Sequence, residues 1–189
     1  MTTEIFRVRE EALEYEFFHK VDEQLLQQLR EKMYFVERRK ALADATGIKD
    51  EDVLNELVEL DISSETIFAL SLFPLVWIAW ADGWIDERQR TAILLAAQST
   101  GHERDTASHH LIEAWLRQKP DEKLQTAWKD YVHAICETLS PAARQSLRSD
   151  VLGRAREVAE AVGTRYGFHD SEGVQDAVLH KIENAFGVD

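Results

Sequence analysis

The fold is decided by the stretch IFALSLFPLVWIAWA, which runs from Ile67 to Ala81. It is apolar at nearly every position, so a helix built from it has no polar face. Such a helix is typical of the centre of a bundle, where other helices cover it on all sides. Pro74 lacks a backbone donor and predicts a kink in this helix. A division into two helices at Ser71 is the alternative.

Helical spacing continues on both sides of this stretch. Upstream, apolar residues three or four positions apart predict a long amphipathic helix from about Glu11 to Ala45, followed by a short helix from Lys49 to about Leu60. The apolar stripe of the long helix consists of Leu13, Phe17, Val21, Leu25, Leu29, Met33 and Val36. Downstream, five more helices are predicted, at about 86–101, 105–117, 121–139, 141–163 and 170–187.

No segment alternates apolar and polar residues as a strand does, so the predicted class is all-α. We expect a pseudo-symmetric bundle of about seven or eight helices with a long N-terminal helix. Residues 1–62 would form an N-terminal helical extension of a long and a short helix, and residues 63–189 would form the bundle. The two parts are expected to make one compact unit.

Composition narrows the class of protein. The net charge of −13 disfavours nucleic acid and anionic lipid as partners, and favours cations or basic proteins. The alternative is that this charge only keeps the protein soluble. Cys136 is the only cysteine, so no internal disulfide can form, and a cytoplasmic protein is expected. The apolar residues around Cys136 in the sequence predict that its side chain is a small buried one. The N-terminus lacks the features of a signal peptide. The apolar stretch from Ile67 is shorter than the ~20 residues of a transmembrane helix, so none is expected.

A loop motif occurs twice. The first copy is Asp82-Gly83-Trp84-Ile85-Asp86, and the second is Tyr166-Gly167-Phe168-His169-Asp170. In each, glycine can end the preceding helix with a positive φ, and the aromatic residue is expected to turn back into the core. The aspartate, Asp86 or Asp170, is expected to cap the next helix, and Gln89 completes a capping box with Asp86.

Two interpretations of these loops remain open. The acidic residues can be helix caps only, which requires no ligand. Alternatively, if the two loops face each other, they form a site for a hard cation such as Ca²⁺ or Mg²⁺, which prefers oxygen ligands. The candidate ligands are Asp82, Asp86, Asp170 and Glu172. Their spacing is not that of an EF-hand.

The run from Val76 to Asp86, VWIAWADGWID, resembles the signature of the tellurite-resistance TerB-like domain family. The resemblance covers roughly 64–188 and is strongest from about Ala79 to Gly101. It implies an all-helical, pseudo-symmetric fold, an acidic patch that binds cations, with Asp82 and Asp86 in it, and a role in bacterial stress response. Gln89 departs from the family pattern, in which glutamate is common.

The leading functional hypothesis is therefore a non-enzymatic, TerB-like helical protein that binds a cation or a partner protein through an acidic loop face. The alternative is a structural module that interacts or forms homodimers through the N-terminal amphipathic helix. An enzyme using the acidic cluster is disfavoured, because the sequence supplies no evident nucleophile with its base and no zinc or nucleotide motif.

Overall fold

The computed structural model describes residues 2–99, 106–161 and 170–187, with side chains for 19–98, 106–161 and 173–187. Eight α-helices and no strands occur in these ranges, which confirms the all-α prediction. The helices are α1 (Thr2–Thr46), α2 (Glu51–Glu59), α3 (Ile67–Ala79), α4 (Glu87–Ser99), α5 (Ala107–Arg117), α6 (Lys123–Thr138), α7 (Pro141–Glu160) and α8 (Asp170–Asn184).

The chain divides into two units, Met1–Lys40 and Ala41–Asp189. The sequence placed this boundary after residue 62 instead. Within the second unit, α2 packs against α6, so the short helix belongs to the bundle. In the described part of the chain, no helix combines the length and the apolar character needed to cross a membrane.

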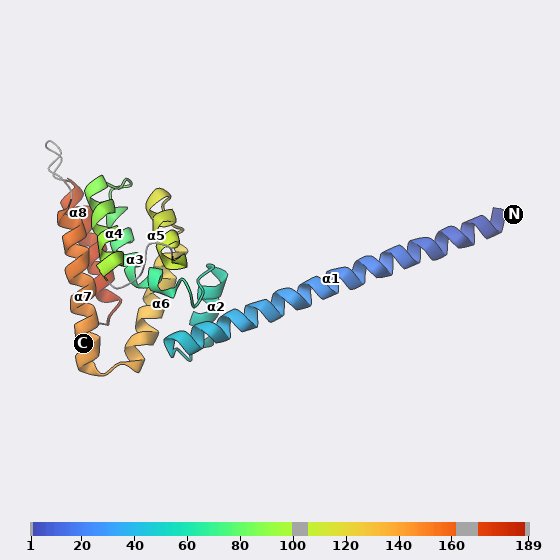
Figure 1. The fold of residues 1–189 in the computed structure, drawn as a ribbon, viewed down its shortest axis with the longest axis horizontal. Coiled ribbons are helices and arrows are strands. Elements are labelled where there is room, and N and C mark those ends of the chain that lie inside the picture. Colours follow the sequence, from blue (N-terminus) through green and yellow to red (C-terminus); the bar gives the residue numbers. More distant parts are fainter. Residues whose placement is uncertain (1, 100–105, 162–169, 188–189) are drawn as a thin grey trace. The chain divides into compact units, whose positions relative to one another are not determined.

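Helix α3 lies at the centre of the second unit. Figure 1 shows α4, α5, α7 and α8 gathered around it, and α3 packs against these four helices and against α6. Its side chains are buried from Ala69 to Ala79, with only Ser71 partly exposed. The helix continues unbroken through Ser71 and Pro74, so the alternative of two helices divided at Ser71 is wrong.

Aromatic rings connect α3 to its neighbours. Phe73 contacts Trp77 on α3 and Trp115 on α5, with ring centroids 6.0 and 5.8 Å apart. Trp77 in turn meets Trp128 of α6 at 6.3 Å, and Trp128 meets Phe186, beyond the end of α8, at 6.2 Å. Most of these pairs are edge-to-face, the arrangement that the ring quadrupole favours. One chain of ring contacts therefore ties four helical segments together.

Two side chains bind the last carbonyl groups of α5. The indole Nε1 of Trp80 donates a hydrogen bond to the carbonyl of Trp115 over 2.8 Å. The guanidinium Nη2 of Arg90 donates to the carbonyl of Leu116 over 2.8 Å. Carbonyl groups in the last turn of a helix lack partners within the helix, so these bonds fix α5 to the end of α3 and the start of α4.

The corner between α3 and α4 depends on Gly83. Its φ is +83°, and its amide donates to the carbonyl of Trp80 over 3.0 Å. The positive φ of Gly83 confirms the predicted left-handed glycine, but α3 ends earlier, at Ala79, and Gly83 lies in the turn that follows. The expectation that Trp84 turns into the core is wrong, because its side chain is 43% exposed. Helix α3 has already ended at Ala79, so the position of Trp84 does not follow the helical period of α3.

We expect Gly83→Ala to destabilise the fold by about 1 kcal/mol, because a Cβ disfavours the left-handed conformation. The matched control is Gly153→Ala, since Gly153 lies within α7 and a Cβ there meets nothing within 4 Å. That change should stabilise the helix by about 0.5–1 kcal/mol. Chemical denaturation of both variants measures the difference. Equal effects of the two substitutions would contradict this account of the corner.

Candidate functional site

Asp86 begins α4 through a reciprocal pair of hydrogen bonds. Its Oδ1 accepts from the amide of Arg88 over 2.8 Å, and the Oε1 of Gln89 accepts from the amide of Asp86 over 3.1 Å. This geometry confirms the predicted capping box. The carboxylate of Asp86 is therefore engaged by the helix that it starts.

Asp82 lies just before the corner and is partly buried. Its Oδ1 is closed off from solvent and has no hydrogen-bond partner among the described residues. The same is true of Nε2 of Gln89, whose side chain is buried. Burial raises the pKa of Asp82 above the usual range of an aspartate, because desolvation disfavours the charged form.

The structure describes less of the second loop than of the first. Helix α8 begins at Asp170, which agrees with the predicted helix start. Gly167 and Phe168, and the side chains of Asp170 and Glu172, lie outside the described residues. The structure thus describes the side chains of Asp82 and Asp86 alone among the four candidate ligands. Among the side chains that it describes, no group of three or more His, Cys, Asp or Glu residues could hold a metal ion.

A separate acidic hollow of about 290 Å³ lies between α2 and α6. It is lined by Asp50, Asp52, Val53, Glu56, Asp130, His133, Ala134 and Glu137. The pKa of Glu56 is raised, first by burial, then by the negative charge of Asp130 and by a hydrogen bond with it. Asp50 already caps α2, accepting from the amides of Asp52 and Val53. Sequence reasoning missed this cluster, because its residues come from two distant helices.

Cys136 is buried on α6, as its sequence context predicted. Burial raises the pKa of its thiol, and the positive charge of Arg144 opposes this effect only in part. The guanidinium Nη2 of Arg144 donates a hydrogen bond to the carbonyl of Cys136 over 2.8 Å. A buried thiol with a raised pKa stays protonated at neutral pH, so this side chain acts in packing.

Large apolar side chains are exposed along α1. Seven of them, between 40% and 64% exposed, are Val21, Leu25, Leu26, Leu29, Met33, Tyr34 and Val36. Five of these belong to the predicted apolar stripe. Exposed apolar residues that are contiguous on one element mark an interaction surface more often than isolated ones do.

Comparison of the chain with protein-family models, with characterised proteins and with solved structures gave no match.

We expect Asp82→Asn to raise the stability at neutral pH by up to about 1 kcal/mol, because the neutral amide avoids the cost of partly burying a negative charge. The stability contributed by Asp82 is fully present below its unfolded pKa of 3.8 and is lost as the pH rises through the higher folded value. The gain of the variant should therefore shrink as the pH falls. Thermal unfolding across a pH series tests this.

The control for this comparison is Asp86→Asn, because asparagine caps a helix about as well as aspartate does. It should change the stability little at any pH. A stability gain for Asp82→Asn that stays constant down to acidic pH would contradict the account of Asp82.

Proposed function

We propose that this protein is an interaction module that associates with a second copy of itself through the apolar face of α1. Leu26, Leu29, Met33 and Val36, here called the seam, carry the proposal. Their spacings of three, four and three residues are those of the a and d positions of a coiled coil. All four side chains are exposed.

Burial of the seam against an identical seam removes apolar surface from water, which favours association by about 25 cal/mol per Å². The remaining positions of this helical segment are mainly charged or amide side chains. Tyr34 and Phe35 are the exceptions between Leu26 and Val36. A helix with an apolar seam and mainly polar side chains at its other positions is typical of a partner in a two-helix interface.

Charge favours the parallel arrangement of the two copies. In a parallel, in-register pair, Lys32 at a g position faces Glu37 at the e position of the second copy. An antiparallel pair centred on the seam places Lys32 opposite Lys32 and Arg30 opposite Arg30 of the second copy. Opposite charges stabilise such flanking contacts, and like charges oppose them, so the seam supports a parallel homodimer.

We expect the double substitution Leu29→Glu and Met33→Glu to abolish self-association, because it places carboxylates in the apolar seam. Sedimentation equilibrium over a concentration series measures the mass. The matched control, Gln24→Glu with Gln28→Glu, adds the same charge at exposed positions of α1 away from the seam and should leave the dimer intact. A wild-type mass that is monomeric throughout would overturn the proposal.

Charge exchange tests the orientation in the same measurement. Lys32→Glu should weaken a parallel dimer, because two carboxylates then face each other on each side. Adding Glu37→Lys to that variant should restore association. An antiparallel dimer would show no such rescue.

A second candidate function is cation binding at the α3–α4 loop. The buried, unpaired Oδ1 of Asp82 favours it, since a cation would supply the partner that this atom lacks. The resemblance of the loop to TerB-like domains supports the same proposal, including a role in bacterial stress response. Asp170 and Glu172 are the further ligands proposed. The oxygen donors suit Ca²⁺ or Mg²⁺.

If this candidate is right, millimolar Ca²⁺ or Mg²⁺ should raise the melting temperature of the wild type, because a ligand bound only by the folded state stabilises it. Asp82→Asn should lose that response, and Asp170→Asn should weaken it. Glu56→Gln, in the separate acidic hollow, is the control and should keep it. Absence of a response in the wild type, or its loss in Glu56→Gln alone, would refute cation binding at this loop.

A further inference from the structure

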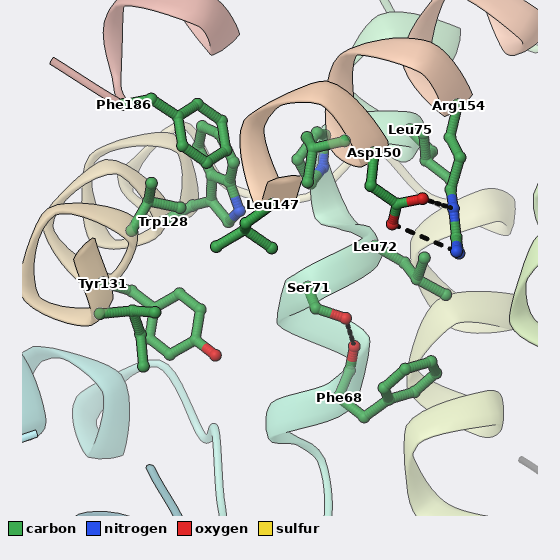
Figure 2. A pocket seen from close by; sticks show the side chains of 14 residues that line it. Phe68, Ser71, Leu72, Leu75, Trp128, Tyr131, Leu147, Asp150, Arg154 and Phe186 are labelled. Atoms are coloured by element: carbon green, nitrogen blue, oxygen red, sulfur yellow. Dashed lines mark hydrogen bonds and ion pairs between the residues drawn. The ribbon is translucent and has the colours of Figure 1, made fainter. Parts of the chain in front are cut away.

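A second hollow, of about 270 Å³, lies between α3, α6 and α7, and Phe186 also lines it. Figure 2 shows its walls. Its lining is mainly apolar. The side chains that make it so include Leu72 and Leu75 of α3, Trp128 and Ile135 of α6, and Leu147 and Val151 of α7.

This hollow is large for a space between the packed helices of a small bundle. Protein cores are packed as densely as organic crystals, and voids larger than a water molecule are few. An apolar cavity of about 150 Å³ is enough to hold benzene. By the same scale, this hollow accommodates roughly ten to twelve non-hydrogen atoms, about the size of a two-ring molecule.

The hydroxyl of Tyr131 points into the hollow and has no hydrogen-bond partner among the described residues. Figure 2 shows this hydroxyl directed from α6 toward α3. Burial raises the pKa of Tyr131, so the phenol is uncharged at neutral pH and can donate a hydrogen bond. Ser71, also in the lining, already donates to the carbonyl of Phe68 over 2.7 Å.

The two charged side chains of the lining form an ion pair with each other. Asp150 and Arg154, one turn apart on α7, form an ion pair with N–O distances of 3.3 and 3.2 Å. Asp150 is exposed, which places the pair at the edge of the hollow. The lining therefore presents no uncompensated charge to a ligand. The net charge of −13 also opposes the approach of an anion.

We propose that this hollow is a binding site for an uncharged, mainly apolar small molecule of about two rings that carries one hydrogen-bond acceptor, and that Tyr131 donates to this acceptor. The apolar walls supply most of the affinity, as in other small-molecule sites, and the hydroxyl fixes the orientation. Neither the seam of α1 nor the loop at Asp82 takes part.

Three probe molecules of similar size test, on the full-length protein, whether the hollow prefers an uncharged ligand with a hydrogen-bond acceptor. They are 1-tetralone, which has a carbonyl acceptor, 1-methyltetralin, which lacks one, and the anion 3-phenylpropionate. Methyl NMR titration follows Leu147 and Val151, which line the hollow. We expect 1-tetralone to bind about fivefold more tightly than 1-methyltetralin, the usual effect of one net hydrogen bond. We expect 3-phenylpropionate to bind more weakly than either.

Substitutions distinguish the contribution of the Tyr131 hydroxyl to binding from the contribution of the volume of the hollow. Tyr131→Phe should remove the preference for 1-tetralone and leave the binding of 1-methyltetralin unchanged. Leu147→Trp should fill the hollow and abolish the binding of all probes, and Val151→Phe provides a second filled variant if the first does not fold. The control is Leu95→Trp, which should leave probe binding unchanged, because Leu95 is exposed on α4 and is not part of the lining.

Four results would overturn the proposal. The first is the absence of methyl shifts with either uncharged probe. The second is probe binding that survives in a folded, filled variant. The third is a preference for 1-tetralone that persists in Tyr131→Phe. The fourth is tightest binding by 3-phenylpropionate.

Discussion

The organisation of the bundle follows from the need to cover α3 on every side. A helix without a polar face is stable in water only where neighbours exclude solvent around its whole circumference, and each Å² left open costs about 25 cal/mol. Five helices meet this requirement, and the ring contacts from Phe73 to Phe186 fix where α5, α6 and the end of α8 lie. The hollow between α3, α6 and α7 is notable in this respect, because unfilled space remains there beside buried residues of α3.

The corner after α3 shows how a buried helix restricts the chemistry beside it. The chain must leave the core and start another helix within a few residues, which uses the positive φ of Gly83 and the capping box of Asp86 and Gln89. Local bonding therefore accounts for the carboxylate of Asp86. Asp82 differs, because one of its oxygens is buried without a partner. Of the two carboxylates, Asp82 is the one that helix capping leaves unexplained.

The helices were predictable from the sequence because helix signals are local. Apolar periodicity and the Asp86 capping box act within a few residues, and the downstream helices begin and end within a few residues of the predicted positions. Trp84 was placed wrongly, because α3 ends at Ala79 and its helical spacing does not extend to Trp84. The acidic hollow and the apolar hollow were missed, since residues such as Glu56 and Asp130 meet only through tertiary packing. Asp170 and Glu172 stay predictions as ligands.

The apolar residues of α3 and of the seam are similar in chemistry and opposite in environment. Those of α3 are buried, whereas Leu26, Leu29, Met33 and Val36 are exposed. The net charge of −13 opposes contact between two copies at long range, but salt screens charges beyond about 8 Å at physiological ionic strength. Within that distance of the seam, the charges that matter are those of its own flanks. There Lys32 and Glu37 attract each other across a parallel pair, so the local charges oppose the repulsion of the whole chain.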